Sequence, residues 1–95
     1  MSTAVAVVPI ERPARYAKQL ASHIGHRVEV TSRDDGYDVT FTDGTGRIDV
    51  AETSLTLTAT SEDSAVLERI KDVLGRHLLQ FTTRLPDVTV EWHDA

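Results

Sequence analysis

The residues best suited to chemistry in this chain lie in one short segment, Tyr16 to His26, with the sequence YAKQLASHIGH. The segment holds two of the four histidines, His23 and His26, together with Lys18 and Gln19. Imidazole nitrogens ligate zinc, copper and iron, and they also donate or accept hydrogen bonds. Because His-x-x-His is a workable spacing on a helix, the segment indicates either a metal site or a polar binding surface.

A third histidine that could join a metal site is His77. It falls on one face of a helix expected in the second half of the chain, a face shared by Val66, Ile70, Val73, Leu74 and Phe81. A histidine in such an apolar stripe is usually a core residue that satisfies its own hydrogen bonds, because an unpaired buried polar group costs about 1–3 kcal/mol. The sharper hypothesis is that His77 meets the flank of the first predicted helix across the shared sheet. A metal-binding protein or metal-dependent enzyme could then use His23, His26 and His77. The chain has no Glu-x-x-His or His-Glu-x-x-His motif, which weakens it.

Nucleophilic chemistry is less well supported. The chain has no cysteine and no Gly-x-Ser-x-Gly elbow, and Ser22 and His23 point about 100° apart on a helix. Gly44-Thr45-Gly46 is followed by strand residues rather than by a helix, so it is typical of a hairpin turn and not of a phosphate loop. We therefore name no catalytic residue, and the sequence favours a binding protein over an enzyme.

The chemistry-bearing segment itself is predicted to be a helix from Pro13 to Ile24. Proline suits the first helical position, and Gly25 supplies the stop. At about 100° per residue, the predicted core face consists of Pro13, Ala17, Leu20, Ala21 and Ile24. A polar stripe runs along its flank: Arg12, Tyr16, Gln19, His23 and, if the last turn stays wound, His26. The stripe is either a binding surface or merely a cover for the seam between helix and sheet.

Alternating apolar and polar residues predict strands around this helix, at 4–8, 28–31, 37–42, 48–50 and 55–60. A second helix is expected to open at Thr60 or Ser61, with acids in its first turn, and to continue to about Thr83. Val88, Val90 and Trp92 predict a last strand. The order β-α-β-β-β-β-α-β indicates an α+β two-layer sandwich, with a mostly antiparallel sheet and two helices on one face.

The size and charge of the chain bound its function. Its 95 residues predict a single domain spanning 1–95. The net charge of −5 disfavours a nucleic-acid partner, although residues 1–33 carry +3 and residues 34–95 carry −8. The basic part is either a set of scattered, solvated charges or a local anion site, and the first is the more common outcome. Residues 4–8 are too short an apolar run for a signal peptide or a membrane span, and the lack of cysteine fits a cytoplasmic protein.

The polar face of the predicted sheet is rich in threonine. It should be either solvated surface or the face of a homodimer, and His93 should lie on it. The expected threonines are Thr31, Thr40, Thr56, Thr58 and Thr89.

Several of these motifs resemble a bacterial family known only as domain of unknown function 2218. The resemblance rests on Arg12-Pro13-Ala14-Arg15-Tyr16, Lys18-Gln19-Leu20, Ser22-His23, Gly25-His26, Asp72-Val73 with His77-Leu78 and Phe81, and a final Val-x-Trp. Lys18, Gln19, His23, His26 and His77 match as motif positions. The chain departs from the family at Ala21, Ile24, Tyr37-Asp38, Gly46 and Gln80, where Cys, an aromatic, Gly-Arg, Cys and Arg are common.

The resemblance implies a protein associated with iron–siderophore handling. Our leading hypothesis is a small binding or accessory module whose partner is an anionic small molecule, an iron chelate or a siderophore-interacting protein. The expected binding residues are Arg12, Tyr16, Lys18, Gln19, His23 and His26. The alternatives are the histidine-dependent metal protein and a structural subunit that dimerises through the threonine face.

Overall fold

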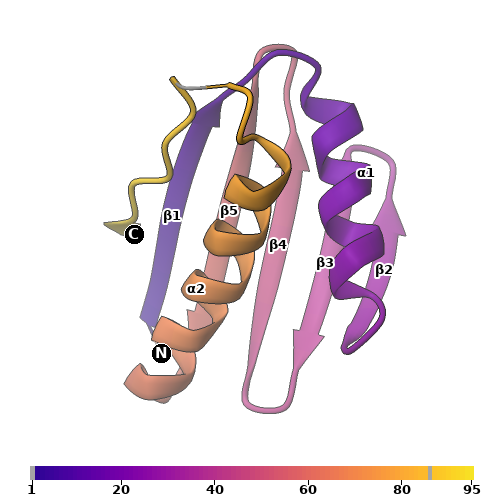
Figure 1. Cartoon of the computed structure of the whole chain (residues 1–95). Helices are drawn as coiled ribbons and strands as arrows, with labels where there is room; N and C mark the ends of the chain where they lie inside the picture. The colour runs from indigo at the N-terminus through magenta and orange to yellow at the C-terminus, as the bar shows by residue number, and fades with distance from the viewer. Residues whose placement is uncertain (1, 86) are drawn as a thin grey trace.

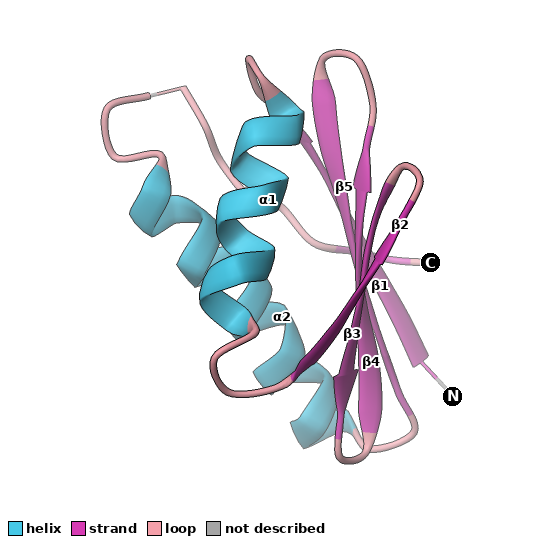
Figure 2. Cartoon of the chain, turned by 90° about the vertical axis from the view of Figure 1, so that its right-hand side faces the viewer, coloured by secondary structure: helices cyan, strands magenta, loops and turns pink. Residues whose placement is uncertain are grey.

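The computed structural model describes residues 2–85 and 87–95, and in them one antiparallel sheet carries two helices on a single face (Figures 1 and 2). The edge-on view in Figure 2 shows both helices on one side of the sheet and none on the other. The α+β two-layer sandwich expected from the sequence is therefore confirmed.

Along the described residues, eight elements follow one another in the chain order that the sequence predicts. They are β1 (Ser2–Pro9), α1 (Pro13–Ile24), β2 (Glu29–Arg33), β3 (Gly36–Phe41), β4 (Gly44–Val50), β5 (Ser54–Ser61), α2 (Ser64–Phe81) and β6 (His93–Asp94). The spatial order of the strands is β2-β3-β4-β5-β1-β6, and every neighbouring pair is antiparallel.

Strict alternation along the central strands creates the buried face. In β5, Leu55, Leu57 and Ala59 are buried and the intervening threonines are partly exposed. Ala4, Ala6 and Val8 do the same in β1. The helices complete this core with Leu20 and Ile24 from α1 and with Ile70, Leu74 and Leu78 from α2. Small alanines in β1 and large aliphatic side chains in the helices thus fill one continuous core.

Helix α1 has the bounds and the buried face that its periodicity predicts. Pro13 stands at its first turn, and the preceding Arg12 adopts a left-handed conformation with φ of 55°. Gly25 follows the last helical residue, but it keeps right-handed dihedral angles, and its N–H donates to the Ala21 carbonyl at 2.9 Å. The helix therefore ends without the left-handed glycine that commonly closes helices.

The predicted start of the second helix at Thr60 or Ser61 is wrong. Strand β5 continues through Ser61, whose buried hydroxyl donates to the Asp43 carbonyl at 2.7 Å. Asp63 is the N-cap, and its carboxylate accepts from the N–H groups of Ala65 and Val66 at 2.8 and 3.2 Å. The acids expected in the first turn thus lie before it, because a carboxylate at the N-cap satisfies N–H groups that the helix leaves free.

The predicted position of the last strand is also wrong. Val88, Val90 and Trp92 are not strand residues, and only His93 and Asp94 pair with β1. Val90 and Trp92 pack instead against α2 at Gly75, where an added Cβ would lie 3.3 Å from Val90 Cγ1. The alternation of partly buried and exposed residues that the sequence predicts is present here, but the partly buried side chains Val90 and Trp92 face a helix. Thr89 consequently does not lie on the outer sheet face, whereas His93 pairs with the outward-facing Val5 as expected.

Gly36 provides a test of the β3–β4 pairing. A Cβ added there would overlap the backbone carbonyl of Ile48 on β4, which cannot move independently of the strand. We expect Gly36→Ala to cost about 1–3 kcal/mol, or at least ~4 °C in Tm by thermal unfolding. Gly46→Ala is the matched control, because its nearest neighbours are the ends of the Leu74 and Phe41 side chains at 3.3 Å. Equal Tm values for the two variants would contradict this pairing.

Candidate functional site

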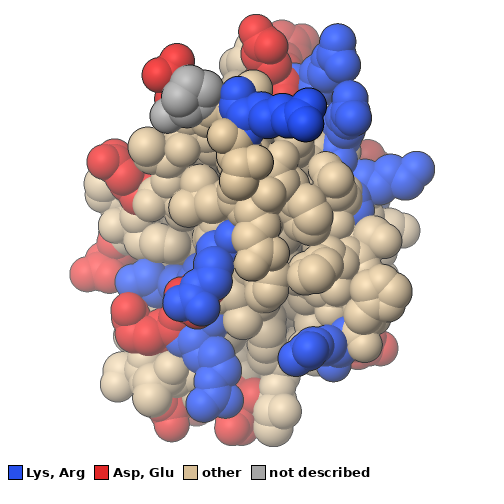
Figure 3. All heavy atoms as spheres, in the orientation of Figure 1, with Lys and Arg blue, Asp and Glu red and all other residues tan. Residues whose placement is uncertain are grey.

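A groove of about 930 Å³ opens where the end of α1, the start of β2, the end of β3 and one face of α2 meet. Its lining residues are His23, Ile24, His26, Arg27, Val28, Glu29, Thr40, Phe41, Thr42, Asp43, Val66, Arg69, Ile70, Val73 and His77. Figure 3 views the molecule from the helix side, where basic side chains flank an uncharged central area.

The groove combines an apolar interior with a charged rim. Ile24 and Ile70 are buried core residues, and Phe41, Val66 and Val73 pack partly buried against the same core. Arg27 and Arg69 bring positive charge, and Glu29 and Asp43 bring negative charge. Such a mixture suits an amphipathic ligand that has an apolar body and at least one charged group.

Two histidines meet at the seam between the helices. The ring centroids of His23 on α1 and His77 on α2 are 4.8 Å apart, and the ring planes are inclined by 48°. Phe81, one turn beyond His77, contacts His23 edge-on with a centroid separation of 5.5 Å. The seam thus brings together imidazoles from opposite halves of the sequence. We call this pair the His23–His77 pair.

A backbone carbonyl determines which nitrogen of His77 carries hydrogen. Nδ1 lies 2.7 Å from the carbonyl oxygen of Val73, one turn earlier in α2. Because a carbonyl only accepts, Nδ1 must be the donor, and in the neutral ring Nε2 then keeps its lone pair. His77 is half-buried rather than sealed in the core as its apolar stripe predicts. Its hydrogen bond nevertheless satisfies it, as expected of a partly buried histidine.

The predicted polar stripe is divided by the structure. His23 and His26 line the groove, but Arg12 lines a separate cavity near the other end of α1, with Glu11 and Glu52. Tyr16 packs half-buried against the core. The exposed Lys18 and Gln19 lie on α1 outside the groove lining. Only the C-terminal end of the stripe therefore contributes to this site.

The proposed three-histidine metal set is only partly brought together. His26 lies in the turn after α1, where its N–H donates to the His23 carbonyl at 3.4 Å. Among residues 2–85 and 87–95, no three His, Cys, Asp or Glu side chains cluster closely enough to hold a metal ion. The His23–His77 pair is the part of the set that the fold assembles.

Sequence reasoning missed the charged members of the groove. Arg69 lies at helical spacing between Val66 and Val73, on the face of α2 that includes His77. The helical period could therefore have predicted that Arg69 lies beside His77. Arg27 and Asp43 lie in turns outside α1, β3 and β4, where no periodicity predicts their direction.

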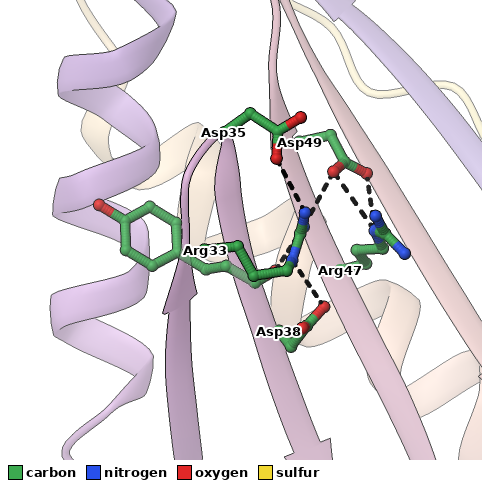
Figure 4. Close-up of polar contacts among 6 residues, drawn as sticks. Arg33, Asp35, Asp38, Arg47 and Asp49 are labelled. Atoms are coloured by element: carbon green, nitrogen blue, oxygen red, sulfur yellow. Dashed lines mark hydrogen bonds and ion pairs between the residues drawn. The ribbon is translucent and has the colours of Figure 1, made fainter.

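A second polar cluster lies on the opposite, outer face of the sheet (Figure 4). The Arg33 guanidinium contacts Asp35 at 3.0 Å and Asp49 at 2.9 Å, and its Nε lies 3.1 Å from Asp38, an ion pair without hydrogen-bond alignment. Arg47 contacts Asp49 from the other side at 3.2 Å. The hydrogen bond with Asp49 raises the pKa of Arg33 against the opposing effect of desolvation, and the charges of Asp38 and Asp49 raise it further. This cluster therefore links β2, β3 and β4 through ion pairs.

A cross-strand row of threonines occupies another part of that outer face. Thr40, Thr45, Thr60 and Thr3 lie opposite one another on successive strands, and the hydroxyls of Thr3 and Thr60 are 3.2 Å apart. Val7 on the same face is 58% exposed. The predicted threonine-rich outer face is thus present, apart from Thr89, and neither helix covers it.

Comparison with known proteins places the chain in a family. A family model described as "Uncharacterized protein conserved in bacteria (DUF2218)" matches residues 5–93. The chain belongs to this family. A solved structure, "NMR structure of PA4090 from Pseudomonas aeruginosa", is similar to this chain in fold, with a TM-score of 0.83 and 22% identity over 98% of this chain and 96% of that chain. No functionally curated protein matches the DUF2218 chain. Among its described residues, no helix is long and apolar enough to cross a bilayer.

Replacing Arg33 tests whether the outer cluster stabilises the fold. Arg33 is 22% exposed and contacts three aspartates, whereas Arg47 is 53% exposed and contacts one. We expect Arg33→Met to lower the free energy of unfolding by about 1–2 kcal/mol, and Arg47→Met by less than about 1 kcal/mol.

In urea titrations, the loss of free energy of unfolding caused by Arg33→Met should be smaller at 1 M salt than at 0.05 M. The Debye length falls to ~3 Å at 1 M, so the aspartates left without Arg33 repel one another less. A larger cost for Arg47→Met, or a cost for Arg33→Met that salt does not change, would contradict the electrostatic account.

Proposed function

We propose that this protein is a binding module that takes a small anionic ligand, of which an iron chelate is one example, into the groove between α1 and α2. The observation that carries the proposal is the pair of groove arginines. None of the ion pairs within residues 2–85 and 87–95 involves Arg27 or Arg69. In a chain with a net charge of −5, two uncommitted guanidiniums beside one groove favour an anion there.

The dimensions and chemistry of the groove support the same proposal. Its volume of about 930 Å³ falls in the range of small-molecule sites, roughly 300–1,000 Å³. Guanidinium groups bind carboxylates and other planar oxyanions through paired N–H donors. Phe41, Val66 and Val73 offer an apolar wall for the rest of the ligand.

The biological setting that we propose comes from the family rather than from the groove. The resemblance to family 2218 implies an accessory role in iron–siderophore metabolism, on a ferric complex or beside a siderophore-interacting protein. The lack of cysteine favours the cytoplasm as the setting. The two arginines and the histidines of the groove suit the negative charge and the oxygen-rich surface of such complexes.

A thermal-shift panel tests the proposal directly. The panel contains ferric citrate, a ferric hydroxamate, a ferric catecholate, the metal-free chelators and a neutral sugar. A ligand at ~100 times its Kd adds ~2.7 kcal/mol, which raises the Tm of a domain this size by more than ~10 °C. We expect at least one anionic compound to give such a shift and the sugar to give none.

The arginine variants locate the binding. Arg27→Gln with Arg69→Gln should abolish the shift, because both guanidiniums of the groove are lost. Arg15→Gln with Arg84→Gln removes the same charge from exposed positions outside the groove and should leave the shift intact. No shift with any anion, or an equal loss in both double variants, would overturn the proposed function.

A further inference from the structure

We propose that the His23–His77 pair binds the metal ion of an anionic chelate that arrives with two adjacent coordination positions open. Such a ligand would place its metal at the helix seam and its negative charge toward Arg27 and Arg69, which line the same groove. This inference deepens the proposed function and rests on it for the chelate's charge.

The hydrogen bond of His77 is the kind that metal-binding histidines make. A ligating imidazole almost always donates its other ring N–H to a carboxylate or to a backbone carbonyl, which orients the ring and raises its basicity. His77 donates from Nδ1 to the Val73 carbonyl at 2.7 Å. Its Nε2 therefore carries the free lone pair, and the ring is held by the helix that bears it.

The spacing of the two rings allows both to bind one ion. Metal–nitrogen bonds of about 2.0–2.1 Å put the centroids of two imidazoles on a shared ion no more than roughly 6.5 Å apart. The His23 and His77 centroids are 4.8 Å apart. Contacts with the rings of His77 and Phe81 place His23 at this seam although it is exposed.

Two imidazoles alone leave a metal ion incompletely coordinated. No group of three ligating residues is present in the described part of the chain, so the protein does not enclose an ion by itself. Nickel, copper and iron accept imidazole together with carboxylate and other oxygen donors. The missing donors must then come from the bound molecule, which is why we infer a chelate rather than a free ion.

Two nickel chelates make the test. Nickel nitrilotriacetate is anionic and leaves adjacent octahedral positions open, whereas nickel ethylenediaminetetraacetate is anionic with its octahedron filled. We expect calorimetry on tag-free protein to show that the first binds at least roughly tenfold more tightly than the second. His23→Gln and His77→Gln should each weaken the first by about tenfold or more.

A matched histidine variant serves as the control. His93 lies on β6 outside the groove, so His93→Gln should leave the affinity within about twofold of the parent. Circular dichroism of each variant checks the fold, and the exposed His23 keeps the test decisive if His77→Gln unfolds.

The outcomes separate this inference from the proposed function. Equal affinity for the two chelates, with a loss only in Arg27→Gln and Arg69→Gln, would overturn the His23–His77 site while supporting the anion groove. Loss in the histidine variants alone would support the metal site and overturn the role of the arginines. Equal loss in His93→Gln, or no binding of either chelate, would overturn the inference.

Discussion

The structure depends on one constraint: the sheet has a single apolar face, and two helices must share it. Alternation in β1 and β5 puts Ala6, Val8, Leu55 and Leu57 on that face, and in β5 it puts threonines on the other. Each helix buries one apolar stripe against that face. This burial contributes a stabilising free energy of about 25 cal/mol per Å² of apolar surface removed from water. The helices therefore lie side by side, and the flanks of their apolar stripes meet above the core (Figure 1).

The candidate site is a consequence of that packing. Residues that border an apolar stripe cannot point fully into the core or fully into water, so they meet their counterparts from the other helix. His23 is such a residue on α1, and His77 is one on α2. The groove opens beside this contact, where the helices reach the ends of β2 and β3, and the turn after α1 adds Arg27. The outer face of the sheet, in contrast, is not covered by the helices. It carries exposed threonines, and the Arg33 cluster links β2, β3 and β4 there.

Much of this could be predicted from local patterns, because a helical face or a strand face is a property of nearby residues. The bounds of α1 and its five buried residues could be predicted from the helical period and from the positions of Pro13 and Gly25. What failed depended on tertiary partners. Val90 and Trp92 alternate as in a strand, yet Gly75 offers them a helix surface. The stripe from Arg12 to His26 is continuous on the helix, but the groove reaches only its last turn, and no pattern within α1 reveals where the second helix lies.

The most direct test of the central claim is a long-range proton–nitrogen NMR spectrum of the four imidazoles, combined with ring-to-ring NOEs. The account predicts that neutral His77 is the Nδ1–H tautomer, because Nδ1 donates to Val73, and that its ring protons show NOEs to His23 and His23 to Phe81. An Nε2–H tautomer for His77, or the absence of NOEs between the two rings, would contradict the seam on which both the groove and the metal site depend.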